Sequence, residues 1–385
     1  MVTKVILFLL CFVGRLHCVK IVTFNTGLAD SVDFYARRRA AIIPAIRKID
    51  FDVMCLQEVF YGNDLIEIEA SLGSHTTSLH MPLTQERGNN GNNEAPCDAA
   101  ARKGSLTCMF TQCANLSQER FINCAFSTCR LDLESQSCIT CLTLDARRMK
   151  TRCILDPGPM NIPGIILLSN RKVFSVKYEF FEDPDLKLLL PRGYISAEIA
   201  GVGTVICTHQ TAFLGPVYLE YTLRELNIYS SWAEQNLAES KKLTALPKSF
   251  GRSAVIVGDI NSSPRISTDI TPLLQDSYQH YIDEGFTSPY VDIDGRCTFC
   301  ADNPLANLTT GINFLLDHVL IKTGSHVINT CTRSWRTNLA AERFLEEIIP
   351  GTRHPKSDHF AVRVDIVPLR QRRGKRYIKE STKLR

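Results

Sequence analysis

Short apolar runs alternate with longer amphipathic segments along most of this chain, and this alternation restricts the possible folds more than any other feature of the sequence. Such runs, bounded by glycine or polar residues, are typical of buried strands. We therefore predict an α/β fold: a four-layer α/β/β/α sandwich of two mixed sheets with outer helices. The predicted strands are residues 19–24, 52–56, 164–169, 194–199, 204–207, 253–257, 314–321 and 360–367.

Two segments have the residue spacing of amphipathic helices. Between Phe34 and Ile49, isoleucines recur at intervals of three and four residues, which places them on one face of a helix. Pro44 lies inside this segment and predicts a kink or a later start, because proline removes one helical hydrogen bond. A second helix is predicted between Tyr218 and Ala238.

The region 84–160 departs from this pattern and is interpreted as a cysteine-rich insertion in a surface loop. Eight of the fifteen cysteines of the chain lie between Cys97 and Cys153. A dense and even set of cysteines favours disulfides over a zinc site, although Cys138 and Cys141 have the spacing of zinc ligands. The pairing stays open, since eight cysteines allow many connectivities.

The cysteines outside the insertion give two further expectations. Cys55 and Cys207 lie in predicted core strands and are expected to be free thiols. Cys297 and Cys300 are expected to close a small loop by a disulfide, unless one of them pairs with Cys331. A chain with this density of disulfides is typical of a secreted protein.

The two ends of the chain differ from the main domain, which is predicted to span residues 19–368. Residues 1–18 combine Lys4 with a nine-residue apolar run, the pattern of a secretory signal peptide, and they predict secretion. Residues 369–385 carry a net charge of +7, so the rest of the chain, whose total is +4, carries −3. This basic tail is interpreted as a solvated end that could contact phosphate or anionic lipid, and the negative body gives little support to a nucleic-acid surface.

Polar side chains lie at or near the ends of several predicted strands; Asp317 lies within the run 314–321, and Asp358 and His359 directly precede the last strand. Taken singly, each has an ordinary explanation as a turn or capping residue. Taken together, they suit chemistry at a phosphorus centre, because carboxylates are hard ligands for Mg²⁺ and histidines transfer protons. Strand ends are also where ligands gather in α/β proteins. The set comprises Asn25, Glu58, His209, Asp259, Asn261, Asp317, Asp358 and His359.

The motifs around these residues, taken in chain order, resemble those of the endonuclease/exonuclease/phosphatase superfamily. The segments that carry the resemblance are LQEVF, GIILLSN, THQ, GDINSSP, LDHVL and SDHF. The resemblance covers residues 19–367 except the cysteine-rich insertion. It implies a divalent metal, Mg²⁺ or Mn²⁺, which Glu58 binds with support from Asn25 and Asp358.

The resemblance also implies roles for the other residues. His359 is the general base that activates water, and Asp317 orients its imidazole. Asp259 and Asn261 position the water and the scissile phosphate, and His209 donates a hydrogen bond to a phosphate oxygen. In an alternative assignment within the family, the residue that matches Asp259 is the base.

Three asparagines match the sequon for N-glycosylation: Asn115, Asn261 and Asn307. A glycan on Asn261 would block the site that the resemblance implies. We therefore predict that Asn115 and Asn307 are the acceptors.

Within the superfamily, two branches fit the sequence best. The segments DVMCLQEVF, RGYISAEI and CTFCADNPLAN resemble neutral C-type sphingomyelinases, which implies a phospholipid substrate and contact with a membrane surface. The secreted deoxyribonuclease I group is the alternative and implies nucleic acid as the substrate. The third hypothesis is a non-catalytic protein that binds a partner through the cysteine-rich insertion.

Overall fold

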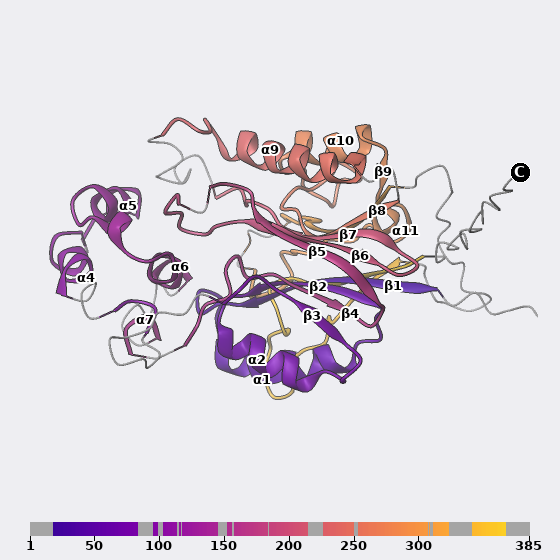
Figure 1. The fold of residues 1–385 in the computed structure, drawn as a ribbon, viewed down its shortest axis with the longest axis horizontal. Helices are drawn as coiled ribbons and strands as arrows, with labels where there is room; N and C mark the ends of the chain where they lie inside the picture. The colour runs from indigo at the N-terminus through magenta and orange to yellow at the C-terminus, as the bar shows by residue number, and fades with distance from the viewer. Residues whose placement is uncertain are drawn as a thin grey trace, which may run out of the picture.

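Two six-stranded mixed sheets stack face to face, and helices cover the outer face of each sheet (Figure 1). This arrangement confirms the predicted α/β sandwich. The computed structural model describes residues 18–366 apart from 84–94, 99–102, 114, 117, 145–151, 156–157, 184, 215–225, 250–252, 307, 309–310 and 323–340. The predicted basic tail and residues 1–17 of the predicted signal peptide therefore lie outside the described residues.

The first sheet has the strand order β11-β12-β1-β2-β4-β3, with β1 and β2 parallel. Its strands are β1 (Val19–Leu28), β2 (Val53–Val59), β3 (Thr77–Leu79), β4 (Ile166–Ser169), β11 (Ala341–Phe344) and β12 (Ala361–Ile366). The second sheet has the order β5-β6-β7-β8-β10-β9, with β7 and β8 parallel. Its strands are β5 (Val173–Phe180), β6 (Gly193–Ile199), β7 (Gly203–His209), β8 (Ala254–Asp259), β9 (Phe286–Thr287) and β10 (Asp317–Lys322).

The central strands are apolar on both faces because each sheet packs on two sides. Ile21 and Val53 of the first sheet meet Ile195 and Val255 of the second sheet in the core between them. On the outer face of β1, Phe24 packs into a second core beneath the helices. Burial on both faces explains why these strands read as near-continuous apolar runs in the sequence.

Four helices cover the sheets. Helices α1 (Tyr35–Lys48) and α2 (Gly62–Ser71) lie against the first sheet, and α9 (Trp232–Ala245) and α10 (Gln275–Asp283) lie against the second (Figure 1). Within the described ranges, no helix is long and apolar enough to cross a membrane. The shorter helical segments are α4 (Ser105–Cys108), η1 (Met109–Cys113), α5 (Gln118–Ser127), η2 (Leu131–Leu133), α6 (Gln136–Leu144), α7 (Arg152–Leu155), η3 (Leu246–Ser249) and α11 (Pro289–Ile293).

Two helix boundaries differ from the prediction. Helix α1 contains Pro44, so the prediction of a later start is wrong. Helix α9 begins at Trp232 rather than Tyr218, and residues 215–225 of the predicted helix lie outside the described residues. The start is set by Ser231, whose side chain accepts a hydrogen bond from the Glu234 N–H at 3.2 Å and so caps the first turn.

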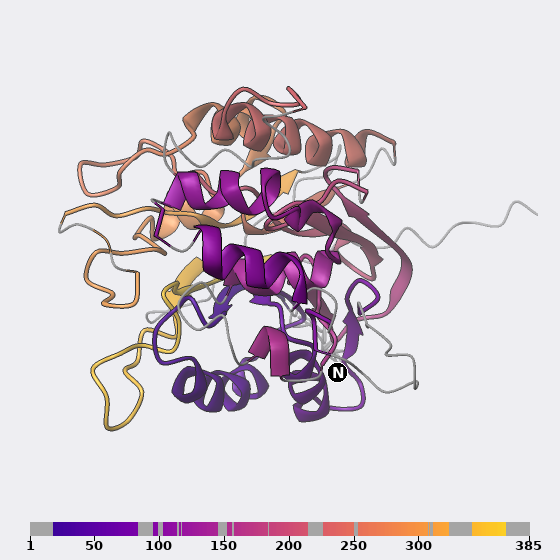
Figure 2. The ribbon, with the colours of Figure 1, turned by 90° about the vertical axis from the view of Figure 1, so that its left-hand side faces the viewer.

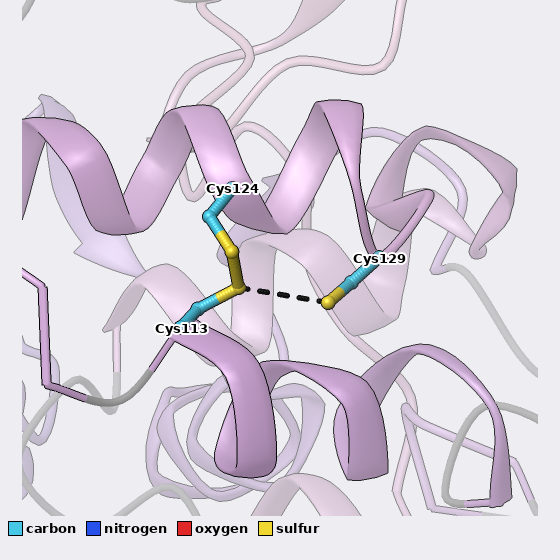
Figure 3. Close-up of side chains that lie close together, drawn as sticks. All are labelled: Cys113, Cys124 and Cys129. Atoms are coloured by element: carbon cyan, nitrogen blue, oxygen red, sulfur yellow. Dashed lines mark hydrogen bonds between the residues drawn. A yellow bond between two sulfur atoms is a disulfide. The ribbon is translucent and has the colours of Figure 1, made fainter.

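The cysteine-rich insertion forms a helical body at one end of the sandwich, and it faces the viewer in Figure 2. All eight of its cysteines are paired in disulfides, which agrees with the preference for disulfides over zinc. One bond joins η1 to α5 (Cys113–Cys124), and another joins α4 to the residue Cys129 that follows α5. The sulfurs of Cys113 and Cys129, which belong to different bonds, lie 3.5 Å apart (Figure 3). The pairs are Cys97–Cys138, Cys108–Cys129, Cys113–Cys124 and Cys141–Cys153.

The expectation that Cys55 and Cys207 are free thiols is wrong. They form a disulfide between β2 and β7, with their Cα atoms 5.4 Å apart, and so join the two sheets through the core. The sequence concealed this bond because 152 residues separate the partners, and because a cysteine in an apolar run also packs as a small hydrophobic residue. The disulfide between Cys297 and Cys300 is present, as one of the two alternatives predicted.

Removing the inter-sheet disulfide is expected to destabilise the fold strongly. Replacing Cys55 and Cys207 together by alanine should lower the free energy of unfolding by about 4 kcal/mol, because the bond closes a long loop in the unfolded chain. The matched control replaces Cys297 and Cys300, which are three residues apart, and should cost only about 1–2 kcal/mol. Urea unfolding without reductant measures both losses, and equal losses would contradict the loop-length explanation.

Candidate active site

The predicted site residues meet at one end of the sandwich, where strands of both sheets end. The parallel pairs β1/β2 and β7/β8 bring the carboxyl ends of four strands to this end. Strands β10 and β12 begin there, because they run antiparallel to β8 and β1. The residues brought together are all eight that the sequence predicted: Asn25, Glu58, His209, Asp259, Asn261, Asp317, Asp358 and His359.

The Asn25 amide connects carboxylates that belong to different sheets. Its Nδ2 donates to Glu58 Oε1 at 3.2 Å and to Asp259 Oδ2 at 3.0 Å. Its Oδ1 accepts the Gly27 N–H at 3.1 Å, which fixes the orientation of the amide. Asn25 is fully buried, so in this orientation it sets the spacing between the two carboxylates.

Two non-glycine residues of the site adopt a left-handed backbone conformation. Glu58 and Asn261 have φ values of 59° and 51°, in the left-handed region that non-glycine residues rarely occupy. Gly27 also has a positive φ, and a Cβ at this position would lie 2.4 Å from Asp358 Oδ1. Gly27 is therefore required for Asp358 to approach the site.

His359 is oriented by Asp317. Its Nδ1 lies 2.8 Å from Asp317 Oδ2, and its ring packs at 4.7 Å from the ring of Phe299. Asp317 is itself held in place, because Thr298 Oγ1 accepts its backbone N–H at 3.1 Å. A carboxylate on one ring nitrogen leaves the other nitrogen directed at the site, as the sequence predicted for this pair.

Asp259 and His359 are neighbouring buried groups whose pKa values are both raised. Burial would lower the pKa of His359, but the carboxylates of Asp317, Asp259 and Asp358 raise it to about 10. Burial and repulsion from Asp317 raise the pKa of Asp259 to about 7. His359 Nε2 lies 3.9 Å from Asp259 Oδ2, which is too long for a direct hydrogen bond and short enough for one water oxygen to contact both.

His209 is held by Arg192, a residue to which the sequence analysis gave no role. Arg192 Nη1 lies 2.7 Å from His209 Nδ1. Because a guanidinium can only donate, Nδ1 must be unprotonated, and the neutral ring carries its proton on Nε2. Burial, and then the Arg192 charge, lower the pKa of His209. The Nε2–H lies 3.5 Å from Asp259 Oδ2 and can donate into the site.

Asn261 supports Asp259 rather than facing solvent. Its backbone N–H donates to Asp259 Oδ1 at 2.9 Å, and its Nδ2 donates to the Gln210 carbonyl at 2.8 Å. Only 6% of Asn261 is exposed, which agrees with its exclusion as a glycan acceptor. Asn115 is exposed, and Asn307 lies outside the described residues.

Comparison with known proteins identifies the family. A model of the Endonuclease/Exonuclease/phosphatase family matches residues 22–359. The chain belongs to this family. Similar solved structures include an endonuclease/exonuclease/phosphatase from Bacteroides vulgatus (TM-score 0.51, 13% identity) and a humanized D. rerio TDP2 (TM-score 0.50, 10% identity). Each comparison covers 91% of this chain, with 99% and 98% of the other chain respectively, and at this identity it shows a shared fold. No curated protein matches the chain significantly.

The members of this family are hydrolases that act on phosphodiester bonds and generally use divalent metals. The donors at this site suit a hard cation, because Glu58 and Asp358 are half-buried carboxylates close enough to repel each other. Desolvation and then this repulsion raise the pKa of Glu58, so a cation between them would be stabilising. Asp259, Asp317 and His359 form a second group whose ligand atoms lie within 4.8 Å of one another. The residues present therefore fit a divalent metal.

Arg38 is a second residue that the sequence analysis missed. It is fully buried and interacts electrostatically with Glu58 and Asp358. Its guanidinium donates to backbone carbonyls between residues 26 and 33, including Gly27 O at 2.7 Å. Arg38 therefore fixes the loop that follows β1 and places a positive charge beneath the half-buried carboxylates.

Replacing Asp317 by asparagine is expected to lower the pKa of His359, because it removes the carboxylate on Nδ1. The folded-state pKa of about 10 lies above the ordinary value of 6.5. The imidazolium therefore stabilises the wild-type fold at pH values below about 6.5, and this contribution is lost as the pH rises through about 10. NMR titration of the His359 ring in EDTA should find the wild-type ring charged at pH 8 and the D317N ring titrating at lower pH. A wild-type midpoint near pH 6.5 would contradict the assignment.

Replacing Arg192 by methionine is expected to release the tautomer of His209. The wild-type ring should show a single tautomer protonated on Nε2, and R192M should show a mixture, since no donor then faces Nδ1. Nitrogen-15 NMR of the histidine rings measures the tautomers, with His209→Gln to assign the signal. Arg192→Lys retains a donor and should preserve the single tautomer; if R192M also preserves it, Arg192 does not set the tautomer.

Proposed function

We propose that the protein is a secreted, Mg²⁺-dependent (or Mn²⁺-dependent) phosphodiesterase that acts on a phospholipid as neutral sphingomyelinases do. The observation that carries this proposal is the convergence of the Glu58 and Asp358 carboxylates with the Asp317–His359 pair at one end of the sandwich. The first pair suits a divalent cation, and the second pair suits proton transfer. A bound metal would polarise the phosphoryl oxygen and neutralise charge that develops on it.

The protein groups divide the remaining work. Asp259 and His359 lie on either side of the position of the attacking water. His359, which Asp317 orients, would act as the base in its neutral form, which a bound cation beside Asp358 would favour by lowering the pKa of the ring. Asp259 is the alternative base, because its pKa is raised to about 7. His209 donates from Nε2 to a phosphate oxygen, where charge increases in the transition state. Asn25 and Asn261 keep Asp259 in position for both steps.

The pairing of cysteines supports an oxidising compartment. The described part of the chain contains the inter-sheet bond Cys55–Cys207, the bond Cys297–Cys300 and the four disulfides of the insertion. Disulfides of this density form and persist outside the cytosol. Together with the apolar N-terminal run, they support secretion, and exposed Asn115 supports glycosylation there.

A secreted nuclease is the alternative, because the matched family includes endonucleases by its name. Charge favours the phospholipid: residues 1–368 carry a net charge of −3, whereas a protein that tracks a nucleic-acid backbone relies on lysine and arginine at the phosphates. The non-catalytic alternative is disfavoured, because every polar residue that the chemistry needs is present and directed at the same place.

A side-by-side assay tests these alternatives. The protein is incubated with sphingomyelin vesicles, plasmid DNA and inositol phosphates, each with Mg²⁺, with Mn²⁺ and with EDTA. We expect phosphocholine release from sphingomyelin, its loss in EDTA, and a fall of about 10²–10⁴-fold in H359A. His80 lies just after β3 and outside the site. The variant His80→Ala is therefore the matched control and should retain full activity. Nicking of DNA alone would support the nuclease, and no hydrolysis of any substrate would support the binding protein.

A further inference from the structure

A cavity of ≈ 190 Å³ adjoins the active site and is not used by the chemistry described above. Arg192, which holds His209, forms part of its lining, so the cavity and the site share a wall. The rest of the lining is mostly apolar and includes Phe180 and Leu188, together with the carboxylate residue Glu182. Pockets that hold drug-sized ligands measure about 300–1,000 Å³, so this cavity suits one small chemical group.

The cysteine-rich insertion supplies one wall of this cavity. Gln136, at the start of α6, lines the cavity and makes two hydrogen bonds to the backbone of Leu188. Its Nε2 donates to Leu188 O at 2.5 Å, and its Oε1 accepts the Leu188 N–H at 3.2 Å. The insertion therefore fixes the segment that leads into Arg192 and β6.

Glu182 places a carboxyl group in the cavity lining without a cation in direct contact. Burial raises the pKa of Glu182, so a bound cation would stabilise its ionised form. Its Oε1 accepts the Tyr229 hydroxyl at 3.3 Å, and its buried Oε2 has no hydrogen-bond partner in the described part of the chain. Among the described residues, Glu182 forms no ion pair. Lys242 interacts with it electrostatically, but the Lys242 ammonium contacts Glu179 Oε1 at 3.0 Å and donates to the Phe180 carbonyl at 2.9 Å. Asp183 adds a second carboxylate to the lining.

We propose that this cavity binds the alkylammonium part of a zwitterionic phosphodiester substrate, such as a choline head group. The inference rests on the proposed phosphodiesterase function and specifies its substrate class. An aromatic ring, apolar walls and a nearby carboxylate are the groups that recognise a quaternary ammonium ion. Arg192 and Glu182 line the same cavity with opposite charges, so the phosphate of the substrate lies on the Arg192 and His209 side while its cation lies against Glu182 and Phe180.

Two soluble esters separate recognition of the head group from hydrolysis. p-Nitrophenyl phosphocholine carries the cation, and bis(p-nitrophenyl) phosphate does not. Glu182→Gln should lower kcat/KM for the phosphocholine ester by about tenfold, which corresponds to about 1.4 kcal/mol, and should change kcat/KM for the other ester by less than about twofold. Glu67→Gln, on α2 and outside the cavity lining, is the matched control and should not change the ratio of the two values. Equal losses on both esters in E182Q would overturn the head-group site.

If neither ester is hydrolysed, the proposed function is overturned, but the head-group site can still be tested. A direct binding measurement then decides the inference. Saturation-transfer NMR with choline and with its neutral isostere 3,3-dimethylbutan-1-ol measures binding without turnover. We expect choline to bind the wild-type protein more tightly than the isostere does, and E182Q to lose this preference. Equal binding of the two compounds to the wild-type protein would overturn the proposed head-group site.

Discussion

The disulfide between Cys55 and Cys207 fixes the relative position of the two sheets directly beneath the site. Glu58 follows Cys55 by three residues on β2, and His209 follows Cys207 by two residues on β7. A site assembled from the ends of two stacked sheets loses its geometry if one sheet slides over the other. The covalent bond prevents this movement in the core, and the Asn25 hydrogen bonds to Glu58 and Asp259 repeat the constraint at the site itself.

The charges at the site are nearly balanced before any ligand binds. The site contains three cationic side chains, Arg38, Arg192 and His359. It contains four carboxylates, so their sum is −1. With all four carboxylates ionised, a divalent cation together with one phosphodiester anion would add a net charge of +1 and bring this sum to zero. The carboxylates concerned are Glu58, Asp259, Asp317 and Asp358. Buried charges cost several kcal/mol each when they are unpaired, so the ion and the substrate complete an arrangement that the protein alone leaves slightly negative.

Much of this arrangement could be predicted from the sequence, because local patterns carry it. Buried strands appear as apolar runs, and the polar residue types that follow them indicate chemistry at a phosphorus centre. The features that were missed depend on contacts between distant segments. Arg38 and Arg192 look like ordinary basic residues in the sequence, because only the fold buries them against the site. Strand β5 was missed for another reason. It is an edge strand with most of its residues exposed, so it lacks the alternation that marks a half-buried strand.

The disulfides of the insertion all close within residues 97–153, and none of them crosses to the sandwich. The insertion is therefore covalently self-contained, while Gln136 extends from it to the wall of the cavity beside the site. A different module, closed by its own cysteines, could replace it without disturbing the pairing of Cys55 with Cys207. Exchange of such a cassette would reshape the cavity and leave the hydrolytic groups in place, so selectivity and chemistry could change independently in this architecture.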